Sequence, residues 1–105
     1  MADRRKNLRK NYNAKVLLKL NEVIKGYGYT IDISIGGVSV NSPDLFALLG
    51  QEKADEILKG TLEVAFIAES LTLQGTISQV NTFKKELVIS ISQISNPTRW
   101  MWLCK

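Results

Sequence analysis

Apolar and polar residues alternate with a period of two in several short segments, and this pattern restricts the chain to a mostly β fold. Between Ala14 and Leu20 the even-numbered residues are apolar, while Lys15 and Lys19 occupy odd positions. Such alternation is typical of a strand with one buried side and one side facing water. Similar short patterns follow at residues 29–35, 38–40, 62–66, 71–80 and 87–91.

These segments predict a six- to seven-stranded antiparallel β-barrel, because an open sheet of this size would leave unpaired edges. The 105 residues suffice for one independent core. We therefore expect a single domain over residues 1–105. Its predicted parts are a flexible basic arm at 1–12, a barrel at 13–95 with one inserted helical segment at 43–59, and an apolar tail at 96–105.

Local signals place the connections within this barrel. Gly26–Gly28 is predicted to turn the chain after the first strand. Ser42 and Pro43 are typical of the N-cap and the first turn of a helix. The apolar phase slips by one between Ile77 and Val80, which predicts a β-bulge or a strand end. The apolar tail is expected to pack on the barrel, on a partner or on a continuation of the chain.

Charge is distributed unevenly along the chain, which has a net charge of +4. The first twenty residues contain seven basic side chains and one acidic side chain, whereas acidic residues are in slight excess in the remainder. A polyanionic partner is therefore expected to bind at the N-terminal arm.

The composition excludes several classes of function. The chain has no histidine, which removes the commonest general base and metal ligand, and its one cysteine, Cys104, allows neither an internal disulfide nor a thiolate zinc site. We expect no enzymatic activity, no catalytic residue, no metal site and a cytoplasmic location. No apolar run is long enough to span a bilayer, so membrane insertion is not expected.

Two motifs carry the chemistry of a candidate binding site. The first is Arg5-x-x-x-Arg9 in the basic arm, and the second is Asp32-x-Ser34-x-x-Gly37 at the end of a predicted strand. In that strand the apolar residues Tyr29, Ile31, Ile33 and Ile35 are expected to face the core, which places Asp32 and Ser34 together on the outer face.

These side chains are complementary to a guanine nucleotide. An arginine matches the O6 and N7 acceptors of guanine, and a carboxylate matches the N–H donors on its Watson–Crick edge. Guanidinium groups and the backbone N–H groups of the Gly36-Gly37 turn suit phosphate oxygens. No phosphate-binding glycine-lysine loop is present, so nucleotide hydrolysis is not implied.

The two motifs resemble those of the PilZ domains, which bind the bacterial second messenger cyclic di-GMP. The resemblance covers nearly the whole chain and implies a barrel fold, an arm that orders on ligand binding, and an unidentified downstream protein partner. Arg4 matches a double-arginine form of the motif that implies two stacked ligand molecules per chain. The ligand-binding residues implied are Arg4, Arg5, Arg9, Asp32, Ser34, Gly36 and Gly37.

The chain departs from the family pattern in two places. Residues 88–91 read Val-Ile-Ser-Ile where many members have Gly-Ile-x-Phe, and the segment 42–60 is longer than expected.

Two alternative functions remain open. One is a small barrel that binds single-stranded nucleic acid, although its aromatic residues do not interleave with the basic cluster and nucleic acid is not the expected partner. The other is a PilZ-like adaptor that binds a protein and no nucleotide.

Overall fold

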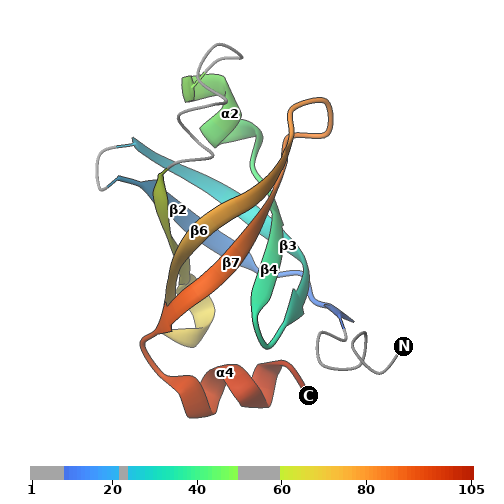
Figure 1. Ribbon diagram of the computed structural model, residues 1–105, viewed down its shortest axis with the longest axis vertical. Coiled ribbons are helices and arrows are strands. Elements are labelled where there is room, and N and C mark those ends of the chain that lie inside the picture. Colours follow the sequence, from blue (N-terminus) through green and yellow to red (C-terminus); the bar gives the residue numbers. More distant parts are fainter. Residues whose placement is uncertain (1–8, 22–23, 50–59) are drawn as a thin grey trace.

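The computed structural model describes residues 9–21, 24–49 and 60–105. Six antiparallel strands close into a barrel in the order β3, β2, β5, β6, β7, β4 and back to β3 (Figure 1). A further short strand, β1, pairs with the last part of β3. The predicted barrel is thus confirmed. The strands are β1 (Lys10–Asn11), β2 (Lys15–Leu20), β3 (Ile24–Ser34), β4 (Gly37–Asn41), β5 (Thr61–Phe66), β6 (Leu71–Asn81) and β7 (Glu86–Ile94), and the helical segments are α2 (Pro43–Leu49), the 3-10 turn η2 (Ile67–Glu69) and α4 (Pro97–Leu103).

The barrel interior is filled by the apolar residues at alternate strand positions. Val16, Leu18 and Leu20 of β2 point inward and are fully or almost fully buried. Burying each of these side chains contributes about 1.5–3 kcal/mol, so the alternating strands supply most of the driving force for folding. The same alternation buries Leu62, Val64, Phe66, Leu71, Leu73, Ile77, Leu87 and Ile89.

Helix α2 lies at one end of the barrel and α4 at the other (Figure 1). The Ser42 hydroxyl accepts a hydrogen bond from the backbone N–H of Leu45 at 3.2 Å, which confirms the predicted N-cap. Leu45 is completely buried and anchors α2 on the barrel. Residues 50–59 of the predicted helical insert lie outside the described residues.

The C-terminal tail packs on the opposite end through one aromatic side chain. Trp100 is completely buried, and its ring meets that of Phe66 edge-on with the centroids 5.6 Å apart. Its indole N–H donates to the Ile35 carbonyl oxygen at 3.1 Å, in the connection between β3 and β4. Met101 and Trp102 are exposed. The prediction that the tail packs on the body is therefore confirmed for Trp100.

The predicted turn at Gly26–Gly28 is wrong, because these residues lie inside β3 and pair with β2. The chain leaves β2 earlier, at Asn21, whose φ of 52° lies in the left-handed region. Both glycines face α2 and the residues before it. A Cβ on Gly26 would lie 2.9 Å from the backbone nitrogen of Leu45, and one on Gly28 would lie 2.7 Å from the carbonyl oxygen of Asn41. These glycines permit close packing and do not form a turn.

The core face predicted for residues 29–35 is also wrong for three of the four apolar residues named there. Tyr29, Ile31 and Ile35 are exposed and only Ile33 is buried. The register of β3 against β4 shifts between Thr30 and Asp32, so the strand changes phase there. Thr30 points inward before the shift, and its hydroxyl accepts from the Ala14 N–H at 2.8 Å and donates to the Tyr12 carbonyl oxygen.

Two other features bear on the predictions. The bulge expected between Ile77 and Val80 is confirmed by a register shift between Ile77 and Gln79. Residues 10–11, which the sequence places in the basic arm, form β1 and are hydrogen-bonded to the sheet. No helix in the described ranges is long and apolar enough to cross a membrane.

Candidate functional site

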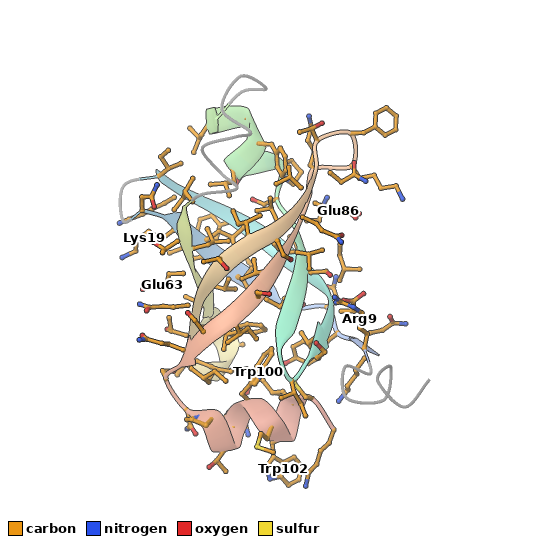
Figure 2. All side chains as sticks on the ribbon, in the orientation of Figure 1. Arg9, Lys19, Glu63, Glu86, Trp100 and Trp102 are labelled. Atoms are coloured by element: carbon orange, nitrogen blue, oxygen red, sulfur yellow. The ribbon has the colours of Figure 1, made fainter. Side chains whose placement is uncertain are left out.

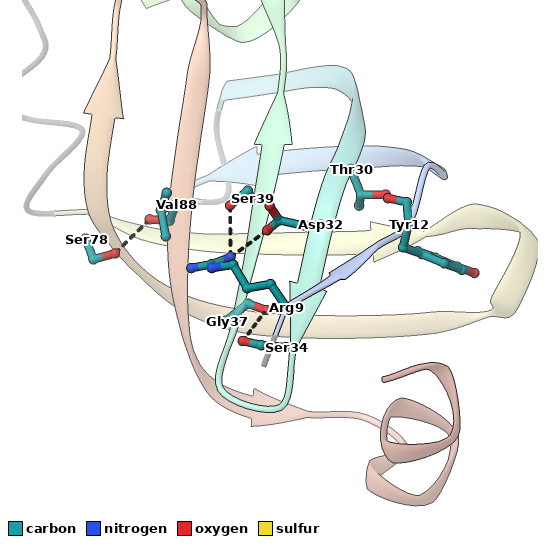
Figure 3. Close-up of polar contacts among 9 residues, drawn as sticks. All are labelled: Arg9, Tyr12, Thr30, Asp32, Ser34, Gly37, Ser39, Ser78 and Val88. Carbon is teal, nitrogen blue, oxygen red and sulfur yellow. Dashed lines mark hydrogen bonds and ion pairs between the residues drawn. The ribbon is translucent and has the colours of Figure 1, made fainter. Parts of the chain in front are cut away.

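Arg9 contacts the end of the β3–β4 hairpin from the outside of the barrel. Its Nη1 donates to Asp32 Oδ1 at 2.6 Å and to Ser39 Oγ at 3.1 Å (Figure 3). The short strand β1 fixes this position, because the residue after Arg9, Lys10, pairs with Ile33 on β3. Residues 23 positions apart in the sequence, from two different motifs, therefore meet in one place. We call Arg9, Asp32 and Ser39 the Arg9 cluster.

The Arg9 cluster is accessible and weakly held. The side chains of Arg9 and Asp32 are 43% and 23% exposed. An exposed ion pair of this kind contributes about 0–1 kcal/mol to stability, because water screens the charges and two side chains lose conformational freedom. Arg9 uses one of its guanidinium nitrogens in these contacts, and a guanidinium has five N–H donors. A ligand can therefore replace or extend these contacts at little cost.

Ser34 and Gly37 of the second motif hold the turn between β3 and β4. Ser34 is 3% exposed, and its hydroxyl donates to the Gly37 carbonyl oxygen at 3.4 Å (Figure 3). A Cβ on Gly37 would lie 3.1 Å from the Ile89 carbonyl oxygen on the neighbouring strand β7. The Gly36 carbonyl oxygen accepts from the Ile91 N–H at 3.0 Å. These residues shape the hairpin that presents Asp32 and Ser39.

The structure places four of the seven predicted ligand-binding residues near Arg9 and leaves two undescribed. Asp32, Ser34, Gly36 and Gly37 all lie on the β3–β4 hairpin beside it. Arg4 and Arg5 lie outside the described residues. The sequence placed Asp32 and Ser34 on one outer face, and Asp32 does point outward, whereas Ser34 is buried in the turn.

Ser39 belongs to the cluster, and motif reasoning missed it. The turn expected from the sequence, Gly36-Gly37, would place Ser34 opposite Ser39, whereas the structure has the two-residue turn at Ile35 and Gly36, with Ser34 paired with Gly37. Counting back from the observed turn places Asp32 opposite Ser39. The pair lies on the outer face because Val38 and Val40, on either side of Ser39, point into the core.

A groove of 650 Å³ begins at Ser39 and runs along the outer face of β7 and β6. Val88 and Ser78 form part of its floor, and the Ser78 hydroxyl donates to the Val88 carbonyl oxygen at 3.1 Å (Figure 3). Glu86 lies farther along the groove. Among the residues that the structure describes, no three carboxylate, thiol or imidazole side chains gather as they would to hold a metal ion.

Comparisons with known proteins support the fold. No family model and no curated protein matches the chain. Among solved structures, the chain is similar to the Bacillus subtilis inhibitor of motility (MotI/DgrA), with a TM-score of 0.62 and 14% sequence identity. The match covers 96% of this chain and 49% of that chain, so this chain spans about half the length of its neighbour. At this identity the likeness shows a shared fold.

Proposed function

We propose that this domain is a non-enzymatic receptor for cyclic di-GMP, which binds at the Arg9 cluster. The observation that carries the proposal is the contact between Arg9 and Asp32, because it joins the last residue of Arg5-x-x-x-Arg9 to the first residue of Asp32-x-Ser34-x-x-Gly37. One residue from each of two motifs that resemble those of the PilZ domains thus lies at the same place on a closed barrel. The fold shared with MotI/DgrA is consistent with a domain of this kind.

The cluster offers the donors and acceptors that a guanine nucleotide needs. The Asp32 carboxylate accepts hydrogen bonds from the N1–H and the N2 amino group of guanine. The Arg9 guanidinium donates to guanine O6 and N7 or to a phosphate oxygen, and its planar face stacks on a purine. Ligand binding exchanges the Arg9–Asp32 ion pair for these contacts, and the exchange costs little because the pair is exposed.

The β3–β4 turn supports the site by its shape. Ser34 holds the turn closed through its hydrogen bond to Gly37, and Gly37 lies against β7, where a Cβ would be 3.1 Å from the Ile89 carbonyl oxygen. Backbone N–H groups of such a turn attract phosphate oxygens. We assign to Ser34, Gly36 and Gly37 the role of positioning the phosphates next to the Arg9 cluster.

Arg4 and Arg5 complete the proposed site from the first motif. By the resemblance, Arg5 contacts the phosphates and a guanine, and Arg4 supports a second, stacked ligand molecule. Ordering of the arm over the ligand would present a new surface to a downstream protein. The MotI/DgrA neighbour is an inhibitor of motility by name. For this chain we propose an output through a protein partner, which remains unidentified.

Isothermal titration with cyclic di-GMP, with GTP and linear di-GMP as controls, tests the proposal. We expect binding of cyclic di-GMP with a weaker response to both controls, and two ligands per chain falling toward one in Arg4→Leu. A stoichiometry of one in the wild type would refute the stacked pair and leave the receptor proposal intact. Failure of the wild type to bind cyclic di-GMP would refute the receptor proposal.

A second candidate function, binding of single-stranded nucleic acid, is favoured by one observation. Lys15 Nζ lies 4.7 Å from the centroid of the Tyr27 ring, and Tyr29 is exposed on the same face of β3. Exposed aromatic rings beside lysines stack on bases and attract phosphates. A competition assay separates the two functions, because affinity for oligonucleotides that rises with their length would favour this candidate. Displacement of oligonucleotides by cyclic di-GMP at lower concentration would favour the receptor.

A further inference from the structure

The outer face of β3 differs in chemistry from the outer face of β6, which lies opposite β3 in the closed strand order. The outward residues of β3 before its register shift are Lys25, Tyr27, Tyr29 and Ile31. Tyr27 and Tyr29 are each 49% exposed. The outward residues of β6 at the corresponding alternation are Thr72, Gln74, Thr76 and Ser78. A strand face in contact with water is normally polar, as on β6, so folding alone does not account for the tyrosines on β3.

Strand pairing makes the tyrosines neighbours of apolar and basic residues on β2. Tyr27 pairs with Leu17, and Tyr29 pairs with Lys15. Lys15 Nζ also lies 4.7 Å from the centroid of the Tyr27 ring, so the lysine bridges the two pairs diagonally. We call Lys15, Leu17, Tyr27 and Tyr29 the tyrosine face. Half-exposed tyrosines beside aliphatic side chains are typical of the centre of a protein–protein interface.

A groove of 630 Å³ adjoins the tyrosine face and separates it from α2. Leu17 and Tyr27 line one side of the groove, and Ala47 and Leu48 of α2 line the other side. Its apolar walls fit a large apolar side chain. Such a side chain, placed in a groove beside aromatic rings, is the kind of anchor on which most of the binding energy of an interface depends.

Charge indicates which partner the tyrosine face suits. The outward residues of β2 and β3, up to Ile31, include three lysines and no carboxylate: Lys15, Lys19 and Lys25. Lys19 lies directly opposite Lys25, an arrangement in which like charges repel, and Glu63 pairs with Lys19 only at 3.8 Å. Acidic side chains of a partner would relieve this repulsion. A second copy of the same face would increase it, because lysines would meet lysines.

The surroundings of the tyrosine face favour a protein over a nucleic acid. Leu17, Ala47 and Leu48 present aliphatic groups, which give bases no aromatic surface to stack on. Asp44 also lines the groove, and its carboxylate repels phosphate groups. An acidic protein segment avoids this conflict, since an apolar side chain can occupy the groove while its carboxylates lie over the lysines.

We propose that the tyrosine face docks an acidic segment of a partner protein, with one large apolar side chain of that segment in the groove beside α2. The proposal names the surface and the chemistry of the protein partner, and it rests on the proposed function for the output that this partner carries. Figure 2 shows Lys19 and Glu63 on the side of the barrel away from Arg9. Docking at the lysine end of the face therefore leaves the Arg9 cluster open to its ligand.

The test uses peptides selected from a random display library against the whole domain. We expect the selected peptides to combine several Asp or Glu residues with a large apolar residue. Fluorescence anisotropy of the tightest peptide should show affinity on the order of tenfold weaker for Tyr27→Ala/Tyr29→Ala. Lys15→Glu/Lys25→Glu should weaken binding by a similar factor, and exchanging the acidic residues of the peptide for lysine should restore binding to this variant alone.

Matched controls come from the connection between β6 and β7, strands that pair with neither β2 nor β3. Phe83→Ala removes an aromatic ring that is 92% exposed, and Lys84→Glu reverses a charge beside it. Both should bind the peptide as the wild type does. Selected peptides without acidic residues would overturn the proposal. So would wild-type affinity in the double tyrosine variant with an unchanged melting temperature.

Two further probes separate the classes of partner. Single-stranded oligothymidine and vesicles of anionic lipid should not displace the peptide. Displacement by either one, with its own binding lost in Tyr27→Ala/Tyr29→Ala, would assign the face to nucleic acid or to a membrane surface and overturn the proposal.

Calorimetric titration with cyclic di-GMP distinguishes this proposal from the receptor proposal. Tyr27→Ala/Tyr29→Ala should bind cyclic di-GMP as the wild type does. A wild type that binds the acidic peptides at the tyrosine face and does not bind cyclic di-GMP would overturn the receptor proposal alone. A wild type that binds cyclic di-GMP and selects no acidic peptide would overturn the docking proposal alone.

Discussion

The two arginine–carboxylate pairs within residues 9–21, 24–49 and 60–105 differ in their hydrogen bonding and their surroundings. Arg99 on α4 donates through Nε and Nη2 to one oxygen of Glu69 in η2, and its own backbone N–H is capped by Asn96. Arg9 donates through Nη1 alone, which it shares between Asp32 and Ser39. The Arg99–Glu69 pair connects helix α4 to the 3-10 turn η2 of the barrel. In the Arg9 pair, Nε and Nη2 of Arg9 donate no hydrogen bond to a described residue.

The surroundings of the two pairs reinforce this difference. Beside Arg99, the buried Trp100 anchors α4 at the end of the barrel. Beside Arg9, a groove opens from Ser39 along β7 and β6. The exposed fractions are similar in the two pairs, 43% and 23% for Arg9 and Asp32 and 50% and 19% for Arg99 and Glu69. The neighbouring buried anchor therefore assigns the Arg99 pair to the packing of the fold, whereas the adjacent groove and the spare hydrogen-bonding capacity of Arg9 favour the Arg9 pair as a binding site.

Replacing Trp100 should produce the largest effect and should affect only stability. Trp100→Ala removes a completely buried indole, its contact with Phe66 and its hydrogen bond to the Ile35 carbonyl oxygen. We expect the free energy of unfolding to fall by about 3–5 kcal/mol, as for other buried aromatic truncations. Urea denaturation measures the loss. Trp102→Ala is the control, since Trp102 is 65% exposed and its removal should cost far less; equal losses would contradict the assigned anchor.

Replacing each arginine by alanine in turn separates the contribution of the two pairs to ligand affinity from their contribution to stability. Arg9→Ala should weaken cyclic di-GMP binding by about 1–3 kcal/mol, or five- to 150-fold, because contacts to a base or phosphate are lost. Arg99→Ala should leave affinity unchanged. Both variants should keep the melting temperature within a few degrees, since each pair is exposed on the arginine side. Calorimetric titration of both variants decides, and equal affinities would remove Arg9 from the site.

Ser39 provides a smaller test of the same cluster. Ser39→Ala deletes an acceptor for Arg9 Nη1 and leaves the β3–β4 pairing intact. We expect binding to weaken by about 0.5–1.5 kcal/mol, which corresponds to roughly two- to 12-fold, because a neutral hydroxyl contributes less than a carboxylate. Ser78→Ala, farther along the groove, is a comparison variant. A Ser39→Ala variant with wild-type affinity would limit the site to Arg9 and Asp32.

The sequence was sufficient for the barrel and for two of the three residues of the Arg9 cluster, Arg9 and Asp32, and the reasons are physical. Strands such as β2 alternate strictly because one side is buried, so their pattern is visible in the sequence. In β3 the pattern fails, since Gly26 is selected by contact with α2 and a register shift after Thr30 reverses the inward face. Both causes depend on distant segments.

The candidate site also contains residues that the sequence identifies and residues that only the fold brings together. Asp32 and Arg9 stood out because charged residues occurred in spaced motifs. Val88 in the adjacent groove has no motif, and it lies beside Ser39 only because β4 pairs with β7. Ser39 depends on the register of the hairpin: a turn at Gly36-Gly37, as expected from the sequence, would place Asn41 opposite Asp32, and the observed turn at Ile35 and Gly36 places Ser39 there.

The smallest expected effect concerns Tyr12, which lies beside the Arg99–Glu69 pair. Burial raises the pKa of Tyr12 above its ordinary value of 10.0, Glu69 raises the pKa further, and Arg99 lowers it. A phenol with a raised pKa in the folded state contributes stability below pH 10, and that contribution is lost as the pH rises through the folded pKa, because the unfolded chain releases the proton first. Glu69→Gln should therefore lower the pKa of Tyr12 and Arg99→Ala should raise it. Ultraviolet titration of the tyrosinate band measures both shifts, in a Tyr27→Phe and Tyr29→Phe background that isolates Tyr12.

The control for this titration is Arg9→Ala, which should leave the pKa of Tyr12 unchanged. A shift as large as that in Arg99→Ala would show that the two arginine pairs are not electrostatically separate.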